Sequence, residues 1–246
     1  MTGGLAGAQL FFFDKLDSTM NRASKLAEDG YPDGTVVVAG QQTSAKGRLG
    51  RSWISPPGQN IYLSVIVRPT LSQLRYVNMA GTLAVCRTIS DISDLSPSIK
   101  WPNDVKVNGR KISGVLLESV IEMGMLKHAV LGIGMNVSLD PSEIPEISSI
   151  ATSLSVELGA YFEKTAVLKI LIERLDQFYN LVKRGCSITE EWVSQMETIG
   201  KTIQVRIGNQ LLEGKARCVD NEGNLVLEKP DGSVLTLIAG EITLQS

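Results

Sequence analysis

The spacing of hydrophobic residues predicts strands and helices in alternation near the start of the chain. Residues 10–16 and 35–39 are short apolar runs of the kind that form strands. Between them, residues 19–28 follow a pair of hydroxyl residues that can cap a helix, and Gly30 is placed to end it. This order predicts a strand, a helix and a second strand that is buried on both faces.

The same pattern continues through the middle of the chain. Residues 61–67 predict a strand, and residues 71–92 repeat apolar positions at helical spacing. A short strand at 99–101 precedes a proline, and residues 104–107 and 111–118 flank an Asn-Gly pair that suits a type I′ turn. We therefore expect a β-hairpin after the short strand.

One further strand and one long helix complete this part of the chain. Residues 128–137 predict a strand that carries two glycines, and residues 141–150 predict a loop. The clearest helix is predicted at 166–183, where apolar residues gather on one face and Gly185 follows the last turn.

The pattern changes after about Thr198. Turn signals at Gly208-Asn209, at 220–223 and at 230–232 separate short apolar runs, which is typical of a small β-barrel. The four predicted strands are 203–207, 211–218, 225–228 and 234–238. We therefore expect an α+β domain over residues 1–195 and a β module over residues 196–246.

An irregular segment of about twenty residues, 41–60, interrupts this regular pattern. Such a long connection inside a compact domain is usually functional or disordered. It contains KGRLGRSW at 46–53, which places three cations, two glycines and an indole within eight residues. Glycines let a backbone approach a ligand closely, and arginines offer paired donors to phosphate or carboxylate oxygens. The segment suits a nucleotide triphosphate, and a solvated basic loop anchored by Trp53 is the alternative.

A second candidate is KWPND at 100–104. Lys100 lies at the end of a predicted strand, where its compact charge can bridge a carboxylate and a phosphate. Asn103 can accept from and donate to a nucleotide. The alternative is a strand end with a buried Trp101 and a surface Lys–Asp pair.

Two weaker candidates remain. Ser18 and Thr19 either cap the first helix or hold a polar, uncharged ring such as a ureido group. Gly132 and Gly134 mark either a close backbone approach or a simple bulge in a strand.

Composition and charge exclude several classes of protein. The chain has 246 residues, 43% of them hydrophobic, and a formal net charge of -2, so it lacks the broad basic face of a nucleic-acid-binding domain. His128 is the only histidine, and the three cysteines have no C-x-x-C spacing, which argues against a disulfide framework and a thiolate or multi-histidine metal site. No signal-peptide core and no membrane span are visible. We expect a soluble cytoplasmic protein.

The order and spacing of these motifs together resemble the biotin protein ligases, also called biotin–[acetyl-CoA-carboxylase] ligases or holocarboxylase synthetases. That family's loop pattern G-R-G-R-x-G-R-x-W, followed by S-P-x-G-x-N, is similar to residues 45–53 and 55–64. Its K-W-P-N-D is present at 100–104, its R-K-x-x-G-I-L-x-E resembles RKISGVLLE at 110–118, and its G-x-G-x-N is present at 132–136. The resemblance covers about residues 10–140 strongly, and the C-terminal module also looks like the family's small domain.

Two positions depart from the family pattern. Ala45-Lys46 replaces the first Gly-Arg of the loop, which keeps the charge but loses the forked geometry of arginine. Met20 replaces an asparagine that normally follows Ser-Thr. Either change is expected to weaken biotin binding or slow adenylate formation.

The resemblance implies a fold, a reaction and partners. The expected fold is a class II synthetase-like mixed sheet flanked by helices, with a small C-terminal SH3-like β-barrel. The expected reaction joins biotin and Mg-ATP into biotinyl-adenylate, and then transfers the biotinyl group to a lysine of a biotin carboxyl carrier protein or of a carrier domain in a biotin-dependent carboxylase. The implied form has no N-terminal DNA-binding domain, so no nucleic-acid or membrane partner is expected. Monomer and homodimer both stay open.

The resemblance also assigns roles to residues. The expected catalytic residues are Lys100 and Arg48. Biotin is expected to contact Ser18, Thr19, Gln42, Lys46, Arg48, Lys100 and Gly114. ATP is expected to contact Arg48, Arg51, Trp53, Lys100, Asn103 and Asn136. Mg²⁺ would arrive with ATP, and no direct protein ligand is assigned to it.

Three alternatives stay open at this point. A lipoate-type ligase would use the same adenylation chemistry, but no R-R-x-S-G-G-G run is present. A catalytically weak biotin-binding protein stays open because of the departures at Lys46 and Met20. A nucleic-acid-binding module would use the basic loop and the C-terminal strands, and the net charge argues against it.

Overall fold

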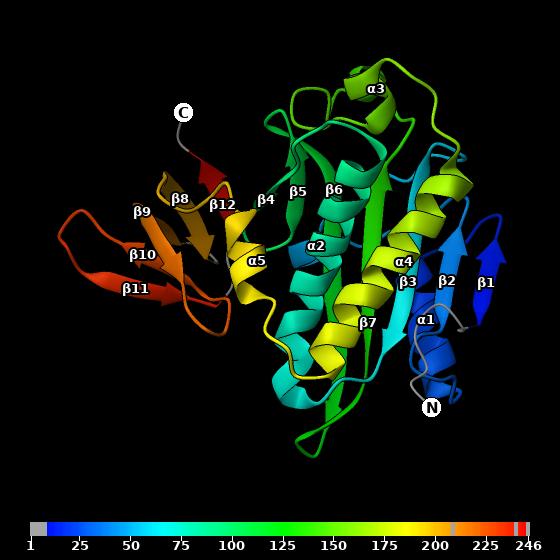
Figure 1. Ribbon diagram of the computed structural model, residues 1–246, viewed down its shortest axis with the longest axis horizontal. Coiled ribbons are helices and arrows are strands. Elements are labelled where there is room, and N and C mark those ends of the chain that lie inside the picture. The colour runs from blue at the N-terminus through cyan, green and yellow to red at the C-terminus, as the bar shows by residue number, and fades with distance from the viewer. Residues whose placement is uncertain (1–8, 208–209, 239–240, 245–246) are drawn as a thin grey trace.

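Two β-sheets of different size organise the chain (Figure 1). The computed structural model describes residues 9–207, 210–238 and 241–244. The larger sheet has seven strands in the order β1-β2-β3-β7-β6-β5-β4. Their bounds are Leu10–Phe13 (β1), Val36–Ala39 (β2), Asn60–Val67 (β3), Ser98–Lys100 (β4), Asp104–Val107 (β5), Arg110–Glu122 (β6) and Met125–Asn136 (β7). The β1–β2 pair is parallel and the other pairs are antiparallel, so the sheet is mixed.

Helices cover the two faces of this sheet unequally. In Figure 1, α2 and α4 lie together across one face, and α1 lies behind the sheet. Helix α1 contacts β2, β3 and β7. It does not cover the part of this face that β4, β5 and β6 form. The helices are α1 (Thr19–Glu28), α2 (Leu74–Ile92), α3 (Leu154–Leu158), α4 (Lys164–Lys183) and α5 (Thr189–Ser194), with 3-10 turns η2 (Arg48–Gly50), η3 (Leu71–Gln73) and η4 (Pro141–Glu143).

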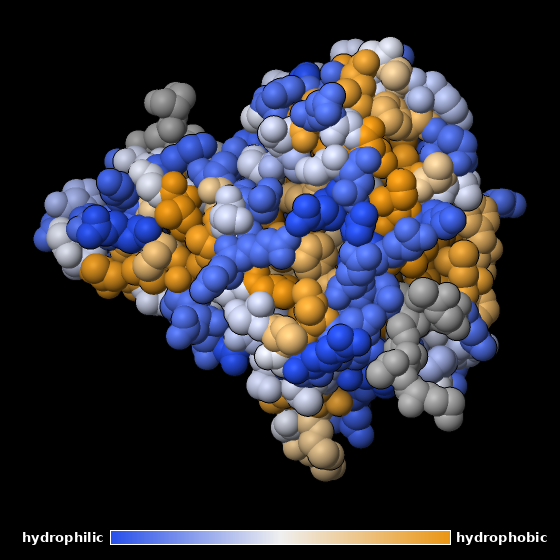
Figure 2. All heavy atoms as spheres, viewed as in Figure 1, coloured by the Kyte–Doolittle hydropathy of each residue, from blue (hydrophilic) through white to orange (hydrophobic). Residues whose placement is uncertain are grey.

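The core follows from the amphipathic pattern of these elements. All eight residues of β3 are buried because it lies between helices on both faces of the sheet. The larger apolar cluster joins the sheet to α2 and α4, and a smaller cluster joins it to α1. On the outer surface of α2 and α4, hydrophilic side chains are mixed with hydrophobic ones (Figure 2).

The first helix begins as the sequence predicts. Ser18 has extended backbone angles, and its hydroxyl accepts a hydrogen bond from the amide of Met20, 3.2 Å away. This side chain satisfies a donor that the first helical turn leaves unpaired. Gly30, with a φ of 89°, follows the last turn.

The smaller sheet contains the C-terminal strands. Its order is β11-β10-β9-β8-β12, and all of its pairs are antiparallel. The strands are β8 (Thr202–Ile207), β9 (Gln210–Val219), β10 (Leu225–Glu228), β11 (Val234–Leu237) and β12 (Glu241–Leu244). All four predicted strands are present, and β12 is an additional one. The turn predicted at Gly208-Asn209 lies outside the described residues. Together the two sheets and their helices confirm the predicted α+β class.

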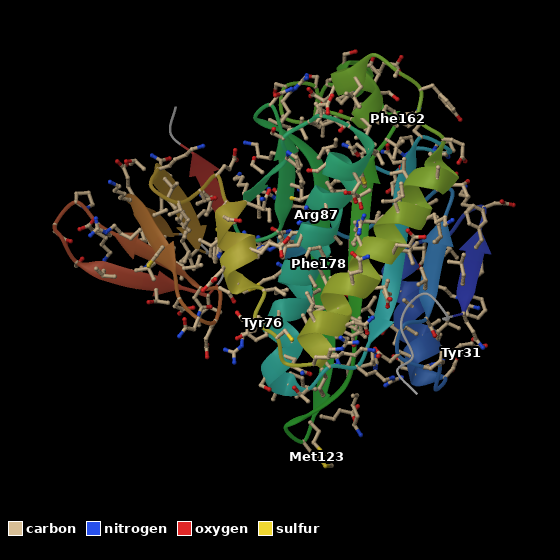
Figure 3. All side chains as sticks on the ribbon, in the orientation of Figure 1. Tyr31, Tyr76, Arg87, Met123, Phe162 and Phe178 are labelled. Atoms are coloured by element: carbon tan, nitrogen blue, oxygen red, sulfur yellow. The ribbon has the colours of Figure 1, made fainter. Side chains whose placement is uncertain are left out.

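The structure also differs from the prediction at the β6–β7 hairpin and at two short helices. The β6–β7 hairpin extends to a turn at Met123-Gly124, well beyond the predicted strand ends, and Met123 projects from its tip (Figure 3). Residues 119–122 are exposed on both faces, so no alternation marked them as a strand. Helices α3 and α5 have five and six residues, too few for a helical period to be visible.

The C-terminal sheet packs against the larger unit through α2 and the chain after β4. Tyr76 extends from α2 toward it (Figure 3), and the Tyr76 hydroxyl donates to the carbonyl of Asn221 at 3.3 Å. The indole of Trp101 donates to the carbonyl of Gly223 at 2.9 Å. One continuous apolar cluster includes residues of both sheets. The division of the chain at residue 195 stays a prediction.

Candidate active site

A cavity of about 440 Å³ opens on the side of the large sheet where α1 lies. Its floor includes Gly114 of β6 and Gly132 and Gly134 of β7. Almost every residue that the sequence singled out lines it, although these residues come from four separate parts of the chain. They are Ser18, Thr19, Gln42, Lys46, Arg48, Arg51, Trp53, Lys100, Asn103 and Gly114.

One end of the cavity is polar and uncharged. Thr19 at the start of α1 donates to the Gln42 side-chain oxygen from its amide at 2.8 Å and from its hydroxyl at 3.1 Å. Ser64 of β3 donates in turn to the Thr19 hydroxyl at 2.8 Å, and Gln42 donates to Ser55 at 3.3 Å. This network fixes the direction of each group, so the end suits a neutral ring with its own donors and acceptors.

Ser18 and Met20 complete this end in different ways. The Ser18 hydroxyl caps the helix and is fully buried, so the structural reading of this residue is correct, although it also lines the cavity. Met20 lies against Gly132, where an added Cβ would be 2.8 Å from its sulfur. Asn21 is exposed and donates to Asp17 at 2.7 Å, so its amide does not replace the one that position 20 lacks.

The middle of the cavity is a flat surface of glycine backbone under Trp53. Gly114 and Gly134 are paired across β6 and β7, and added Cβ atoms there would be 3.0 Å and 2.6 Å from the Trp53 ring. Lys111 lies over the same indole, 5.1 Å from a ring centroid. The indole nitrogen of Trp53 is buried without a hydrogen-bond partner, which leaves a donor for a ligand. Trp53 is therefore a wall of the cavity and does not fill the core.

The other end is strongly cationic. Lys100, Lys106 and Lys111 belong to the neighbouring strands β4, β5 and β6, and all three line the cavity. Lys111 pairs with Asp104 at 2.7 Å, and Lys106 pairs with Glu197 at 2.9 Å. Among the described residues, Lys100 forms no such ion pair. Burial lowers the pKa of Lys100, and the charge of Asp104 acts in the opposite direction.

Two residues of this end, Lys106 and Lys111, were missed by the sequence reasoning. Lys111 lies inside the stretch 110–118 that carried the family resemblance, but it received no role. The alternation of buried and half-buried residues along β5 could have identified both lysines as neighbours on the cavity face. On β5, Val105 and Val107 are buried, so Asp104 and Lys106 share the opposite face, and pairing across the hairpin places Lys106 opposite Lys111.

The basic loop lies across the cavity and is held at two points. Arg48 donates to the side-chain oxygen of Asn103 at 2.8 Å, and Asn103 is itself held by a bond to the carbonyl of Val115 at 2.7 Å. Lys46 pairs with Glu118 at 3.0 Å. Asn103 is thus an anchor that directs Arg48 into the site.

Asn136 does not line the cavity. It is buried, accepts from Asn60 at 3.2 Å and donates to the carbonyl of Thr152 at 2.9 Å. The neighbouring residues Ser149 and Ile150 do line the cavity. Any effect of Asn136 on a ligand therefore passes through the segment that it supports.

The charges of the cavity indicate an anionic ligand. Among the described residues of its lining, six are cationic, namely Lys46, Arg48, Arg51, Lys100, Lys106 and Lys111, and one, Asp104, carries a carboxylate. Within the part of the chain that the structure describes, no three His, Cys, Asp or Glu side chains gather in a metal-binding group. Neither does any helix there have the length and apolar character needed to cross a membrane.

Comparisons with known proteins agree with this geometry. The sequence profile of the biotin/lipoate A/B protein ligase family matches residues 12–136, and that of the biotin protein ligase C-terminal domain matches residues 198–244. The chain is 34% identical to the bifunctional ligase/repressor BirA of Bacillus subtilis, over 92% of this chain and 71% of BirA. It is 29% identical to a biotin–[acetyl-CoA-carboxylase] ligase of Mycobacterium tuberculosis, over 85% of this chain and 79% of that protein.

Solved structures show the same likeness. The biotin protein ligase of Aquifex aeolicus in complex with biotin and ATP superposes with a TM-score of 0.80 at 30% identity. The superposition covers 96% of this chain and 98% of that one.

Proposed function

Because the chain belongs to the biotin/lipoate A/B protein ligase family, we propose that it is a biotin–protein ligase. It activates biotin with ATP as biotinyl-adenylate and transfers the biotinyl group to a lysine of a biotin carboxyl carrier protein. One observation carries this proposal. The motif residues form a single cavity with a neutral polar end and a cationic end, as a molecule with a ureido ring and a carboxylate requires when it reacts with a triphosphate.

The first step joins two anions. A carboxylate oxygen of biotin attacks the α-phosphorus of ATP, and pyrophosphate leaves with the electron pair of the broken P–O bond. Such a reaction depends on positioning and charge stabilisation more than on a protein nucleophile. Ser18, Thr19 and Gln42 would hold the ring of biotin. Its carboxylate then extends over Gly114, where a side chain would obstruct it, toward the lysines.

The cations supply the electrostatic part. Lys100 would lie where carboxylate and phosphate meet, with Lys46 and Arg48 approaching from the loop. Half-buried in the wall of the cavity, Lys100 acts in surroundings where its charge is screened less than in water. Trp53 and Arg51 would line the nucleotide, and the Trp53 N–H offers it a hydrogen-bond donor.

In the second step the biotinyl-adenylate must stay bound until the carrier lysine arrives. The neutral amine of the carrier lysine attacks the carbonyl carbon of the mixed anhydride, AMP leaves, and the amine loses a proton as the amide forms. Until then the loop must retain the adenylate. Arg48 would contribute through its bond to Asn103, so Asn103 acts by positioning Arg48 as well as by lining the site.

Magnesium fits the cavity as a partner of ATP. Mg²⁺ is usually held by one or two carboxylates together with substrate phosphates and water. Among the described residues of the lining, Asp104 carries the carboxylate and would face such an ion, while Lys111 beside it balances its charge. The ion would neutralise phosphate charge.

Partner and location follow the same proposal. The carrier would be a carboxylase carrier protein or domain, as the names of the ligase relatives indicate for those proteins. A cytoplasmic location and the absence of a nucleic-acid partner remain proposals, and monomer and homodimer both remain open. Lipoate is the main rival substrate because the family profile includes lipoate ligases, but the match to a biotin protein ligase C-terminal domain favours biotin.

Pyrophosphate exchange tests the proposal directly. Purified protein, Mg²⁺, ATP and labelled pyrophosphate are incubated with biotin, with lipoate, or with no acid. Exchange that depends on biotin supports adenylation of biotin, and Lys100→Ala should abolish it without unfolding the protein. Exchange with lipoate alone would identify a lipoate ligase. Biotin binding without exchange would identify a binding protein and direct attention to Lys46 and Met20.

A further inference from the structure

Lys106 stands in the cationic end of the cavity but belongs to none of the functional assignments above. It lies on β5 between the buried residues Val105 and Val107, so its side chain is on the cavity face of the sheet. Its amino group pairs with Glu197 at 2.9 Å, and both side chains are largely buried, at 15% and 14% exposure. Glu197 Oε1 accepts no hydrogen bond from the described residues, so this contact is an ion pair by proximity, and a mostly buried pair of this kind is costly to maintain.

The position of Glu197 is fixed by the joint between the two sheets. Glu197 lies in the segment between α5 and β8, and its amide donates to the carbonyl of Ile99 on β4 at 3.0 Å. Ile99 in turn donates to the carbonyl of Gln195 at 2.7 Å, and the Glu197 carboxylate accepts from Ser98 at 3.3 Å. The carboxylate therefore has a defined place beside the sheet, and it holds the Lys106 amino group at the wall of the cavity.

Three lysines consequently form a row across adjacent strands. Lys106 is paired in register with Ser98 on one side and with Lys111 on the other, and Lys100 lies diagonally from it on β4. Neighbouring strands are about 4.8 Å apart, so three amino groups across β4, β5 and β6 can face several phosphates at once. A ligand with a single carboxylate would not require three lysines in a row. Holding Lys106 in advance also removes part of the side-chain entropy that a flexible lysine loses on binding.

We propose that Lys106 binds the β- and γ-phosphates of ATP and the pyrophosphate that leaves, and that Glu197 is the residue that positions it. This inference rests on the proposed adenylation of biotin. The segment that leads into the C-terminal strands therefore supplies Glu197, which holds a phosphate-binding lysine in place. Ile242 of β12 lines the same cavity, so the C-terminal strands also form part of its wall.

The first test compares substitutions of Lys106 with one of Lys201. Lys106→Met removes the charge and keeps the length of the side chain, whereas Lys106→Arg keeps the charge. Lys201→Met is the matched control, since Lys201 approaches the same Glu197 at 4.0 Å but is half-exposed and does not line the cavity. In carrier biotinylation, Lys106→Met should raise KM for ATP about tenfold and weaken inhibition by pyrophosphate as much, with KM for biotin within about twofold of the parent.

Lys106→Arg and Lys201→Met should stay within about threefold of the parent in both constants. Glu197→Gln should raise KM for ATP by a smaller factor, and should add nothing further in a Lys106→Met background. An unchanged KM for ATP in Lys106→Met, or an equal rise for ATP and biotin, would refute the phosphate role. A lower KM for ATP in Glu197→Gln would show that Glu197 opposes binding and does not position Lys106.

A binding measurement separates this inference from the proposed reaction. An ATP analogue with a methylene group between the α- and β-phosphorus cannot release pyrophosphate, so calorimetric titration with it reports phosphate binding alone. If the parent protein catalyses no exchange but binds the analogue about tenfold more tightly than Lys106→Met, the reaction assignment fails and the phosphate site stands. Equal binding by parent and Lys106→Met refutes the phosphate site, whatever the reaction is.

Discussion

Substitution of Gly134 by alanine should damage catalysis far more than stability. Gly134 lies on β7 between β3 and β6, where it is paired with Tyr62 and Gly114, so its backbone has no freedom to move. An added Cβ would be 2.6 Å from the Trp53 ring, and ordinary contact begins at 3.4 Å. The indole must therefore shift outward by about 0.8 Å, the difference between these two distances.

The size of the effect follows from where that shift occurs. Trp53 is bound to the loop at its amide, which donates to the carbonyl of Ala45 at 3.1 Å, so movement of the ring disturbs the basic loop as well. A misplacement of about 1 Å in a catalytic site can reduce the rate about a hundredfold, equivalent to roughly 2.7 kcal/mol. The free energy of unfolding should fall by only about 1 kcal/mol, the low end for overpacking, because the partly exposed indole can move toward solvent.

The assay is biotin-dependent pyrophosphate exchange, combined with thermal unfolding. Gly214→Ala is the matched control, because its Cβ would overlap the carbonyl oxygen of Glu228 in the C-terminal sheet and Gly214 is not among the residues that line the cavity. It should lower stability and leave kcat/KM unchanged. In a Trp53→Ala background, Gly134→Ala should cause no additional loss. Parental exchange in Gly134→Ala, or a loss that persists without the indole, would refute the reasoning.

Three other predictions concern single side chains of the cavity. Burial lowers the pKa of Lys100, so exchange should decline with rising pH below the usual range of lysine, and Lys100→Arg should move that decline to higher pH; identical profiles would contradict a charged role for Lys100. Arg48→Gly should shorten the lifetime of bound adenylate in a gel-filtration release assay, and Asn103→Ala should do so to a smaller extent, whereas parental retention in both would remove the Arg48 clamp. Met20→Asn should lower KM for biotin about fivefold at a cost of about 2 kcal/mol in stability, and an unchanged KM would show that Met20 does not weaken biotin binding.

The sequence alone was sufficient wherever structure depends on neighbours along the chain. The Ser18 cap follows from local capping, the continuous burial of β2 from an uninterrupted apolar run, and the apolar face of α4 from a period of 3.6 residues. The motifs at 46–53 and 100–104 also supply eleven of the described residues that line the cavity, because their chemistry is concentrated in short runs. Where the local signal was weak, as in α3, α5 and β12, the prediction failed.

Only the tertiary structure decided which of these residues meet. The row of Lys100, Lys106 and Lys111 exists because β4, β5 and β6 are neighbours in register, and its anchor Glu197 comes from the joint to the second sheet. The contact of Trp53 with Gly134 joins residues that are remote in the sequence. A strand period shows which face a side chain occupies, but not which strand lies beside it, because pairing is fixed by the packing of the whole chain. The sequence thus reveals which residue types form the site, whereas the fold determines which of those residues contact one another.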